Sequence, residues 1–374
     1  MLHTVKPRKL ALAIALITTS THYFMPTYAQ AASASPEVNI GGAVRLNYGW
    51  RDYDNDSNGK FEIELFRIDA DVSQDKWYLD AQFRWYQDFD AIHHAEVGYK
   101  VDENNTVIAG VTQVPFGIAP YASNSFWFTG AYYVGLEDDY DTGVKWQTKG
   151  DGWNADLAYF FNAEYDDGAR YSRYSFDIAS TDERANREDG QVNGRIQYQL
   201  GNHTVGASAQ LGKFINSQSQ DKGDHWAAGA HYVGTFGSWK VSGQLMQYDY
   251  DTEESLGTAD HRIALSAFEF PFDIAAKATL SNLNIAKTFT YNNDLVDSIT
   301  CYNEVTLIDP NDRSGLAESI QNVTGCAIAK GGLYTYVDWI AGKNMWFVGG
   351  PGVGIEQGPE RWRSRLNINI GYYF

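Results

Sequence analysis

Apolar and polar residues alternate with a period of two along most of the chain, which predicts β-strands with one apolar face. Residues 38–50 show the clearest alternation, and their apolar face consists of Val38, Ile40, Val44, Leu46, Tyr48 and Trp50. The last twelve residues repeat it, with large apolar side chains at every second position from Leu366 to Phe374. The pattern therefore predicts strands at both ends of the chain.

Sixteen such segments follow one another along the sequence. They are residues 38–50, 61–73, 77–86, 92–100, 106–114, 140–148, 153–161, 189–198, 203–212, 224–233, 239–248, 261–269, 272–285, 298–308, 327–340 and 363–374. An even number of strands places both chain ends on the same side of a closed barrel. We therefore expect an all-β fold, a transmembrane antiparallel β-barrel of sixteen strands. The alternative fold is a soluble β-sandwich. A sandwich has no need for apolar positions that face outward on every strand, so the pattern favours the barrel.

Short turns and longer loops alternate between these segments, as the two ends of a barrel require. The short turns are residues 74–76, 101–105, 149–152, 199–202, 234–238 and 270–271, and the longest loops are 115–139, 162–188 and 341–362. One connection breaks the rule, because residues 309–326 should form a short turn but are too many. We expect an inserted helical turn there, around Leu316–Gln321.

Residues 1–31 have the layout of a secretory signal peptide. Lys6, Arg8 and Lys9 precede the apolar stretch LALAIALI, and Ala29-Gln30-Ala31 offers a small-residue cleavage site. We therefore expect export, with residues 32–374 forming the barrel. Export favours a disulfide between the two cysteines, Cys301 and Cys326, the alternative being two buried thiols.

Composition narrows the class of protein further. The net charge of −18 disfavours binding to nucleic acid. A mean hydropathy of −0.40 looks soluble, yet 25 Tyr, 19 Phe and 11 Trp are present. A polar average with many aromatic residues fits strands that face lipid on one side and water on the other.

Three stretches of sequence carry a resemblance to a known family. Gly110–Gly117 ends in Pro-Phe-Gly, Asp141–Val144 opens a strand after a long loop, and Trp362–Phe374 closes the chain. They resemble the phosphate-selective porins O and P and their relatives of unassigned substrate, and the resemblance extends over most of residues 38–374. It implies a trimeric porin of sixteen strands with its third loop folded into the lumen. It also implies that the terminal Phe374 is part of the signal read by the outer-membrane assembly machinery.

The resemblance does not imply phosphate selectivity. Phosphate-specific members place lysines and arginines at the constriction, whereas residues 115–139 contain neither.

The strand phase sorts charged residues into those that face the lumen and those that do not. It predicts that the pore is lined by Arg45, Arg67, Arg84, Arg365, Asp69, Asp71 and Asp80. The four arginines lie on the last strand and the first three, which become neighbours when the barrel closes. Lys277 is predicted to point inward from the far wall. These arginines either face an acidic loop across the pore, which would set up a transverse field, or only pair with the wall aspartates.

The third loop supplies the candidate constriction. Its predicted constriction residues are Tyr121, Phe126, Trp127, Phe128, Glu137, Asp138 and Asp139. The aromatic side chains either offer a stacking surface to a ring-like solute or anchor the loop to the wall, and anchoring is the simpler interpretation. The basic wall favours anions and the acidic loops favour cations, so the sequence leaves the sign of the selectivity open.

Motifs for catalysis and metal binding are missing from the sequence. It contains no His-Glu-x-x-His, Gly-x-Ser-x-Gly or P-loop pattern. Asp54, Asp56, Asn58 and Gly59 resemble the start of a calcium loop, but Leu65 replaces the glutamate that such a loop needs at its twelfth position. We therefore expect no catalytic residue, metal or cofactor, although weak calcium binding by acidic loops stays open.

These patterns predict a porin of the bacterial outer membrane, a water-filled channel for passive diffusion of small hydrophilic solutes or ions. The alternatives are an outer-membrane barrel enzyme of the lipase or protease class, or a channel specific for a sugar or an anion. The expected partners are outer-membrane lipid and lipopolysaccharide, the assembly machinery, two further copies in a homotrimer, and the permeating solutes.

Overall fold

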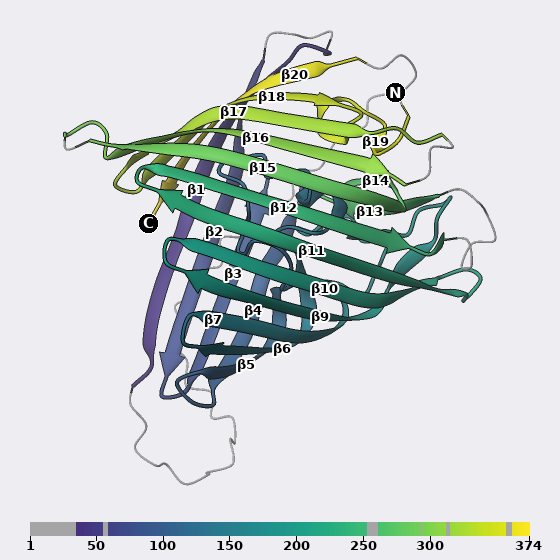
Figure 1. The fold of residues 1–374 in the computed structure, drawn as a ribbon, viewed down its shortest axis with the longest axis horizontal. Helices are drawn as coiled ribbons and strands as arrows, with labels where there is room; N and C mark the ends of the chain where they lie inside the picture. The colour runs from purple at the N-terminus through teal and green to yellow at the C-terminus, as the bar shows by residue number, and fades with distance from the viewer. Residues whose placement is uncertain (1–34, 55–58, 253–260, 292, 312–314, 357–360) are drawn as a thin grey trace, which may run out of the picture. The chain divides into compact units, whose positions relative to one another are not determined.

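The chain folds into a closed antiparallel barrel of sixteen strands (Figure 1). The structure, a computed structural model, describes residues 35–54, 59–252, 261–291, 293–311, 315–356 and 361–374. The predicted signal peptide, residues 1–31, lies outside the described residues. Within the described residues, no helix is long and apolar enough to cross a membrane.

The barrel strands run in chain order, each paired with the next. They are β1 (Glu37–Arg51), β2 (Lys60–Gln74), β3 (Trp77–Tyr86), β4 (Asp90–Lys100), β5 (Asn105–Gln113), β6 (Tyr140–Gly150), β7 (Trp153–Ala163), β9 (Asn186–Leu200), β10 (His203–Asn216), β11 (Lys222–Phe236), β12 (Trp239–Tyr250), β15 (Lys277–Thr290), β16 (Ser298–Pro310), β17 (Ser319–Lys330), β18 (Leu333–Lys343) and β20 (Arg363–Tyr373).

The first and last strands close the barrel. β1 pairs with β20 so that Ala43 lies opposite Tyr373. Beyond that pair, the backbones of Gly42 and Phe374 exchange two hydrogen bonds of 3.0 and 3.1 Å. The C-terminus therefore ends beside the first half of β1, and both ends lie on the same side, as the even strand number predicts.

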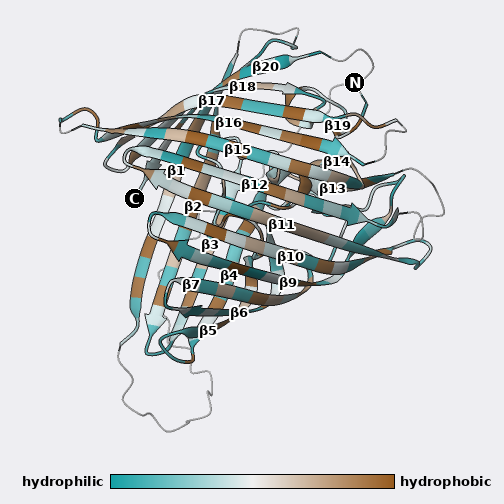
Figure 2. Ribbon diagram, in the orientation of Figure 1, coloured by the Kyte–Doolittle hydropathy of each residue, from teal (hydrophilic) through white to brown (hydrophobic). Residues whose placement is uncertain are grey.

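Alternate positions of each strand face outward, and these positions are largely apolar. In β2, the side chains of Phe61 and Ile63 are 61% and 64% exposed. In a soluble protein, large apolar side chains of this kind are mostly buried. Figure 2 shows the resulting alternation of hydrophobic (brown) and hydrophilic (teal) residues along the strands. An apolar outer surface with every backbone group paired within a closed sheet is the arrangement that a barrel in lipid requires.

The predicted strand count is confirmed, but one predicted barrel strand is wrong. Residues 261–269 and the start of 272–285 form a hairpin of β13 (Arg262–Ala267) and β14 (Phe270–Ala275). This hairpin is not part of the barrel wall and belongs to a separate sheet. The chain turns at Phe268 and Glu269, which both have positive φ, so 270–271 is the start of a strand and not a turn between barrel strands. Most of the hairpin is buried, and a strand that never faces lipid or water does not need an alternating sequence.

One strand of the barrel wall, β17, was not predicted, which is why the predicted number of strands is still correct. Residues 309–326 are not a long turn with helix around Leu316–Gln321, because Ser319 already begins β17. The outward positions of β17 include Asn322 and Thr324, which hydrogen-bond with Asn303 of β16. Polar side chains on the outer face weaken the hydrophobic alternation, and the strand was therefore missed. Gly331 and Gly332, inside the predicted segment 327–340, form the real turn between β17 and β18.

Four loops at the other end of the barrel are long. We call them the third loop (residues 114–139), the fourth loop (164–185), the sixth loop (251–276) and the eighth loop (344–362). A second sheet of four strands joins the last three of these loops, in the order β19 (Gly352–Val353), β14, β13 and β8 (Asp177–Ile178).

The apolar core of the protein lies among these loops. Phe176, Leu265, Phe272 and Val353 belong to one buried cluster that also includes Tyr133 of the third loop. The ring of Tyr133 stacks on Phe347 at 4.4 Å and meets Phe176 at 5.7 Å. The sheet made by the loops thus packs against the third loop and helps to hold it in place.

Candidate pore constriction

Three arginines project inward from the middle of three consecutive strands. Arg67 is the central residue of β2, and it lies directly opposite Arg84 of β3. Arg45 occupies the corresponding part of β1. Arg45 and Arg84 lie against rings of the third and fourth loops, and Arg67 lies opposite Arg84, so all three point inward. The structure thus brings together the residues that the strand phase grouped.

Carboxylates and aromatic rings hold the first two of these arginines. Arg45 forms two contacts of 2.7 Å with Glu64 and lies over the Phe126 ring, at 5.3 Å from its centre. Arg67 pairs with Asp69 at 3.0 Å and lies 5.4 Å from the centre of the Tyr373 ring. Their side chains are 13% and 19% exposed, so part of each remains accessible to a passing solute.

Loops cover the other two predicted arginines. Arg84 is buried under the Tyr174 ring of the fourth loop, at 4.3 Å, and donates to Gln82. Arg365 is buried under the Trp127 ring, at 3.8 Å, and donates to the carbonyl of Phe347. These two side chains fasten loops to the wall and are poorly placed to meet a solute.

The three wall aspartates have different environments. Asp69 neutralises Arg67, and Asp71 lies opposite Asp80 on the next strand. Asp80 accepts a hydrogen bond of 2.8 Å from the ring of His94, and His94 in turn contacts His93. A bulge in β4 at His93 brings both histidines to the inner side of the wall.

The third loop crosses the lumen along the inner wall, which confirms its predicted place. Its backbone bonds to side chains of four barrel strands. The pairs are Gly117 with Ser208 of β10, Ile118 with Gln244 of β12, Gly130 with Thr306 of β16, and Phe126 with Asp338 of β18. Polar groups inside a barrel that would otherwise bind water thus hold the loop backbone instead.

Most of the aromatic side chains of the third loop anchor it. Trp127 stacks on Phe347 at 5.5 Å, Phe128 stacks on Tyr132 at 4.3 Å, and Phe126 packs near Tyr336 of β18 at 6.0 Å. Tyr121 differs, because it is 46% exposed and meets only the edge of Phe128. Of the predicted stacking surface, Tyr121 is the side chain placed to face the lumen.

The predicted acidic face of the constriction is not present, which corrects the transverse-field hypothesis. Glu137, Asp138 and Asp139 are all buried, with exposures of 4%, 6% and 7%. Glu137 accepts hydrogen bonds from the amides of Ala122 and Ser123 and therefore fixes the fold of its own loop. Asp138 accepts from the hydroxyl of Tyr174. The carboxylates of Glu137 and Asp138 therefore bind groups of the protein and do not form an acidic face of the pore.

Burial governs the ionisation of these loop carboxylates. It raises the pKa of Glu137 from its ordinary value of 4.5 to about 7, against the hydrogen bonds from Thr129, Ser123 and Ala122 that lower it. Burial also raises the pKa of Asp138, again against the hydrogen bond from Tyr174.

Sequence reasoning missed Glu64 and misplaced Lys277. Glu64 lies in a bulge of β2, where the phase of the strand breaks, so a strict period of two could not place it. Lys277 points outward rather than inward, since the buried, inward positions of β15 are Ala278, Leu280 and the following even-numbered residues. It pairs with Asp249 at the end of β12.

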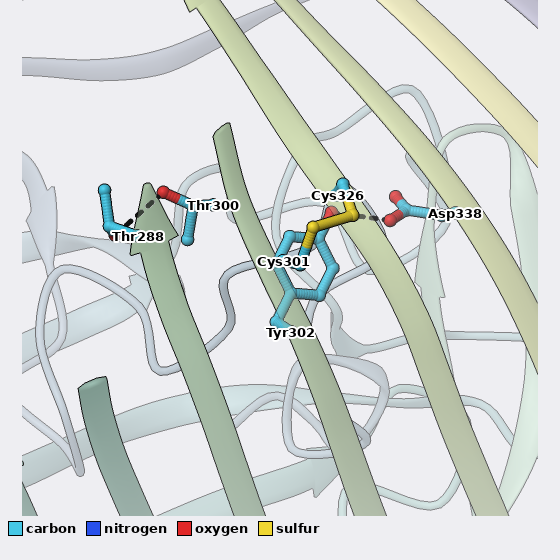
Figure 3. Close-up of a disulfide and its surroundings, with 6 residues drawn as sticks. All are labelled: Thr288, Thr300, Cys301, Tyr302, Cys326 and Asp338. Carbon is cyan, nitrogen blue, oxygen red and sulfur yellow. Dashed lines mark hydrogen bonds between the residues drawn. A yellow bond between two sulfur atoms is a disulfide. The ribbon is translucent and has the colours of Figure 1, made fainter. Parts of the chain in front are cut away.

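A disulfide joins Cys301 of β16 to Cys326 of β17. The two residues are directly opposite each other, on neighbouring strands, with their Cα atoms 4.0 Å apart (Figure 3). Tyr302 beside Cys301 points inward and donates to Asp338 of β18 at 2.6 Å. The disulfide thus closes the end of this hairpin that is distant from its loop.

The fold is similar to that of solved outer-membrane channels. The outer membrane channel DcaP of Acinetobacter baumannii has a TM-score of 0.61 and 11% identity, covering 91% of this chain and 97% of that one. OmpT of Vibrio cholerae in its trimer form has a TM-score of 0.59 and 12% identity, with 91% and 100% covered. An anion-selective porin from Comamonas acidovorans has a TM-score of 0.57 and 11% identity, also with 91% and 100% covered. No protein-family model and no curated protein matches the sequence.

Proposed function

We propose that this protein is a porin of the bacterial outer membrane, through which small hydrophilic solutes or ions diffuse passively. The observation that carries the proposal is the sixteen-strand closure with an apolar outer face and the third loop inside the lumen. Barrels of this size are wide enough that their side chains do not fill the interior, and a loop folded inside narrows the passage.

The outer surface and the closing strand support the proposed location. Outer-membrane lipid and lipopolysaccharide would cover the apolar belt, and the assembly machinery would read the closing strand with its terminal Phe374. The ring of Phe374 faces outward and is 57% exposed.

The selectivity need not follow that of the phosphate-selective porins O and P. The third loop contributes aromatic side chains and no cation to the lumen, and the accessible arginines Arg45 and Arg67 are paired with carboxylates. A channel with paired charges and one exposed tyrosine fits a general diffusion pore for small polar solutes better than an anion-specific one.

Conductance in planar bilayers tests the proposal. The refolded, heat-modifiable protein should give discrete conductance steps, and liposomes containing it should swell in small sugars but not in large ones. Protein that is folded by the heat-modifiability assay and gives no steps above the lipid baseline would contradict the proposal.

We further propose a homotrimer. Support comes from the similar fold of OmpT in its trimer form, and from the polar cluster of Asn303, Asn322 and Thr324 on the outer face. A polar patch is unfavourable against lipid even when its members bond with one another, and a second copy of the chain can cover it. An unheated sample should migrate as a trimer on a mild gel, and a monomer in several detergents would count against it.

A barrel enzyme is the weaker candidate. The wall does contain an aspartate next to a histidine, Asp80 and His94. The chain of contacts then runs to His93, whose ring is buried between Tyr140 and Tyr174, both 4.2 Å from it. An enclosed imidazole of this kind is better placed to satisfy the wall than to attack a substrate.

A further inference from the structure

Three buried carboxylates from two stretches of the chain meet inside the protein. Asp139 ends the third loop, Asp141 lies at the start of β6, and Asp177 begins β8 in the fourth loop. Each offers an oxygen, and these oxygens lie within 4.8 Å of one another. The residues are 7%, 0% and 2% exposed, so water does not screen their charges.

The surroundings add further negative charge. Glu164 and Glu188 lie close enough to interact electrostatically with Asp139. The guanidinium of Arg173 approaches Asp177 at 3.4 Å, and its other donors serve the carbonyls of Arg170 and Asp167. One arginine against five carboxylates would leave a large excess of buried negative charge, which is relieved when a cation binds or when some of the carboxylates take up protons.

Independent evidence for a ligand comes from the neighbouring strands. Gln191 of β9 is 3% exposed, and its amide nitrogen donates to Asp141 at 2.5 Å, yet its amide oxygen has no hydrogen-bond partner. Thr112 of β5 is fully buried and lies directly opposite Asp141, and its hydroxyl has no partner either. One oxygen each of Asp139 and Asp141 is buried and unpartnered too.

We propose that Asp139, Asp141 and Asp177 bind a calcium ion, with the amide oxygen of Gln191 as a further ligand. Calcium takes six to eight oxygen ligands in flexible geometry, and carboxylate and amide oxygens are its usual protein ligands. The site differs from residues 54–59, where the sequence resembles a calcium loop; most of that stretch lies outside the described residues.

The ion would have a structural consequence. Its ligands come from the third loop, from the barrel wall at β6 and from the fourth loop. The fourth loop carries β8, which forms one edge of the sheet of loops. Calcium would therefore tie this sheet to the wall and to the base of the third loop. The site does not depend on what the pore conducts.

Calcium binding to the complete refolded barrel tests the proposal. Titration calorimetry at neutral pH should show one calcium ion bound per chain, and calcium should raise the melting temperature relative to a chelator. Asp141→Asn and Asp177→Asn should each weaken binding by about tenfold or more, since each removes a charged ligand. Glu183→Gln is the matched control, because its side chain lies in the same loop and is 83% exposed.

Asp141→Asn should also change the order of stability. In chelator this variant should be at least as stable as the parent, because it removes one of several buried like charges, and in calcium it should be less stable. Asp177→Asn also removes the partner of the buried Arg173, so calcium affinity is its readout. Heat-modifiability shows whether each variant has formed its barrel. Absence of calcium binding by the parent, unchanged affinity in both variants, or an equal loss in Glu183→Gln would overturn the proposal.

Discussion

At the scale of single residues, the side chains of the third loop act mainly on the loop itself. Glu137 is the clearest case, because its carboxylate accepts hydrogen bonds from the backbone on the opposite side of the loop. A charged residue in a loop of a porin would ordinarily be assigned to the pore. Here the carboxylate oxygens of Glu137 accept hydrogen bonds that fix the shape of the loop that narrows the pore.

The raised pKa of Glu137 predicts a pH dependence. With a pKa of about 7 in the folded chain and 4.5 in the unfolded one, the folded loop keeps a proton that the opened loop releases. The free energy of opening should therefore be highest below pH 4.5 and fall by up to about 3 kcal/mol as the pH rises to about 7. Hydrogen exchange of the amides of residues 121–130 would measure this.

Glu137→Gln supplies the comparison. The variant keeps one acceptor for the amides of Ala122 and Ser123 but cannot ionise, so most of the pH dependence over this interval should disappear. If exchange in the variant and the parent responds equally to pH, another group is responsible and the assignment to Glu137 is incorrect.

The wall arginines could be placed from the sequence, whereas the loop side chains could not. Arg45, Arg67 and Arg84 lie in strands, where a period of two fixes the side-chain direction. Glu137, Asp138 and Asp139 lie in a loop without a period, and their burial depends on Tyr174 and on backbone amides distant in sequence. The bulge at Glu64 shows the same limit within a strand.

At the scale of strands and loops, the hairpin of β16 and β17 is the element that the sequence represents least clearly. Its outer face is partly polar, and its open end is closed by Cys301 and Cys326. The sequence also assigns one strand to the wall by mistake, because β13 and β14 are apolar enough for wall strands. In the structure both are buried among the loops. A correct strand number was thus reached with one wall strand missed and one false.

Removing the disulfide should weaken the barrel without preventing its closure. The cross-link spans 25 positions in sequence, and the chain-entropy estimate for such a loop is roughly 3 kcal/mol, as an upper value for strands that also pair. The double variant Cys301→Ser, Cys326→Ser should still be heat-modifiable but should lose this form at a lower temperature. An unchanged transition, with the parent shown to be oxidised by its gel mobility, would refute a stabilising role.

The terminal residue should matter for assembly rather than for the stability of the finished barrel. Phe374 closes the last pair of backbone hydrogen bonds with Gly42, and its ring faces outward. Deleting it should lower the amount of heat-modifiable protein in outer-membrane fractions, whereas Phe374→Tyr, which keeps a terminal aromatic ring, should have little effect. Normal assembly of the deletion variant would show that the end of the chain is not the signal.

At the scale of the whole molecule, the barrel wall holds the third loop, and the sheet of loops packs against the third loop in turn. The wall holds the third loop through inward polar side chains, and the sheet of loops packs on its far side through Tyr133, Phe176 and Phe347. The acidic residues that give the chain its charge are partly buried in this assembly. The buried loop carboxylates therefore add no charge to the surface that a solute meets in the lumen.

The reversal potential in a salt gradient tests most directly whether Arg67 and its neighbours line the narrow part of the pore. Arg67→Glu changes the local charge by two units beside Asp69, in a passage where the dielectric is lower than in bulk water. Lys277→Glu makes the same charge change on the outward face and is the matched control. We predict that Arg67→Glu shifts the reversal potential toward cations while Lys277→Glu leaves it nearly unchanged. Equal reversal potentials for the parent and Arg67→Glu, with both channels open, would contradict the account.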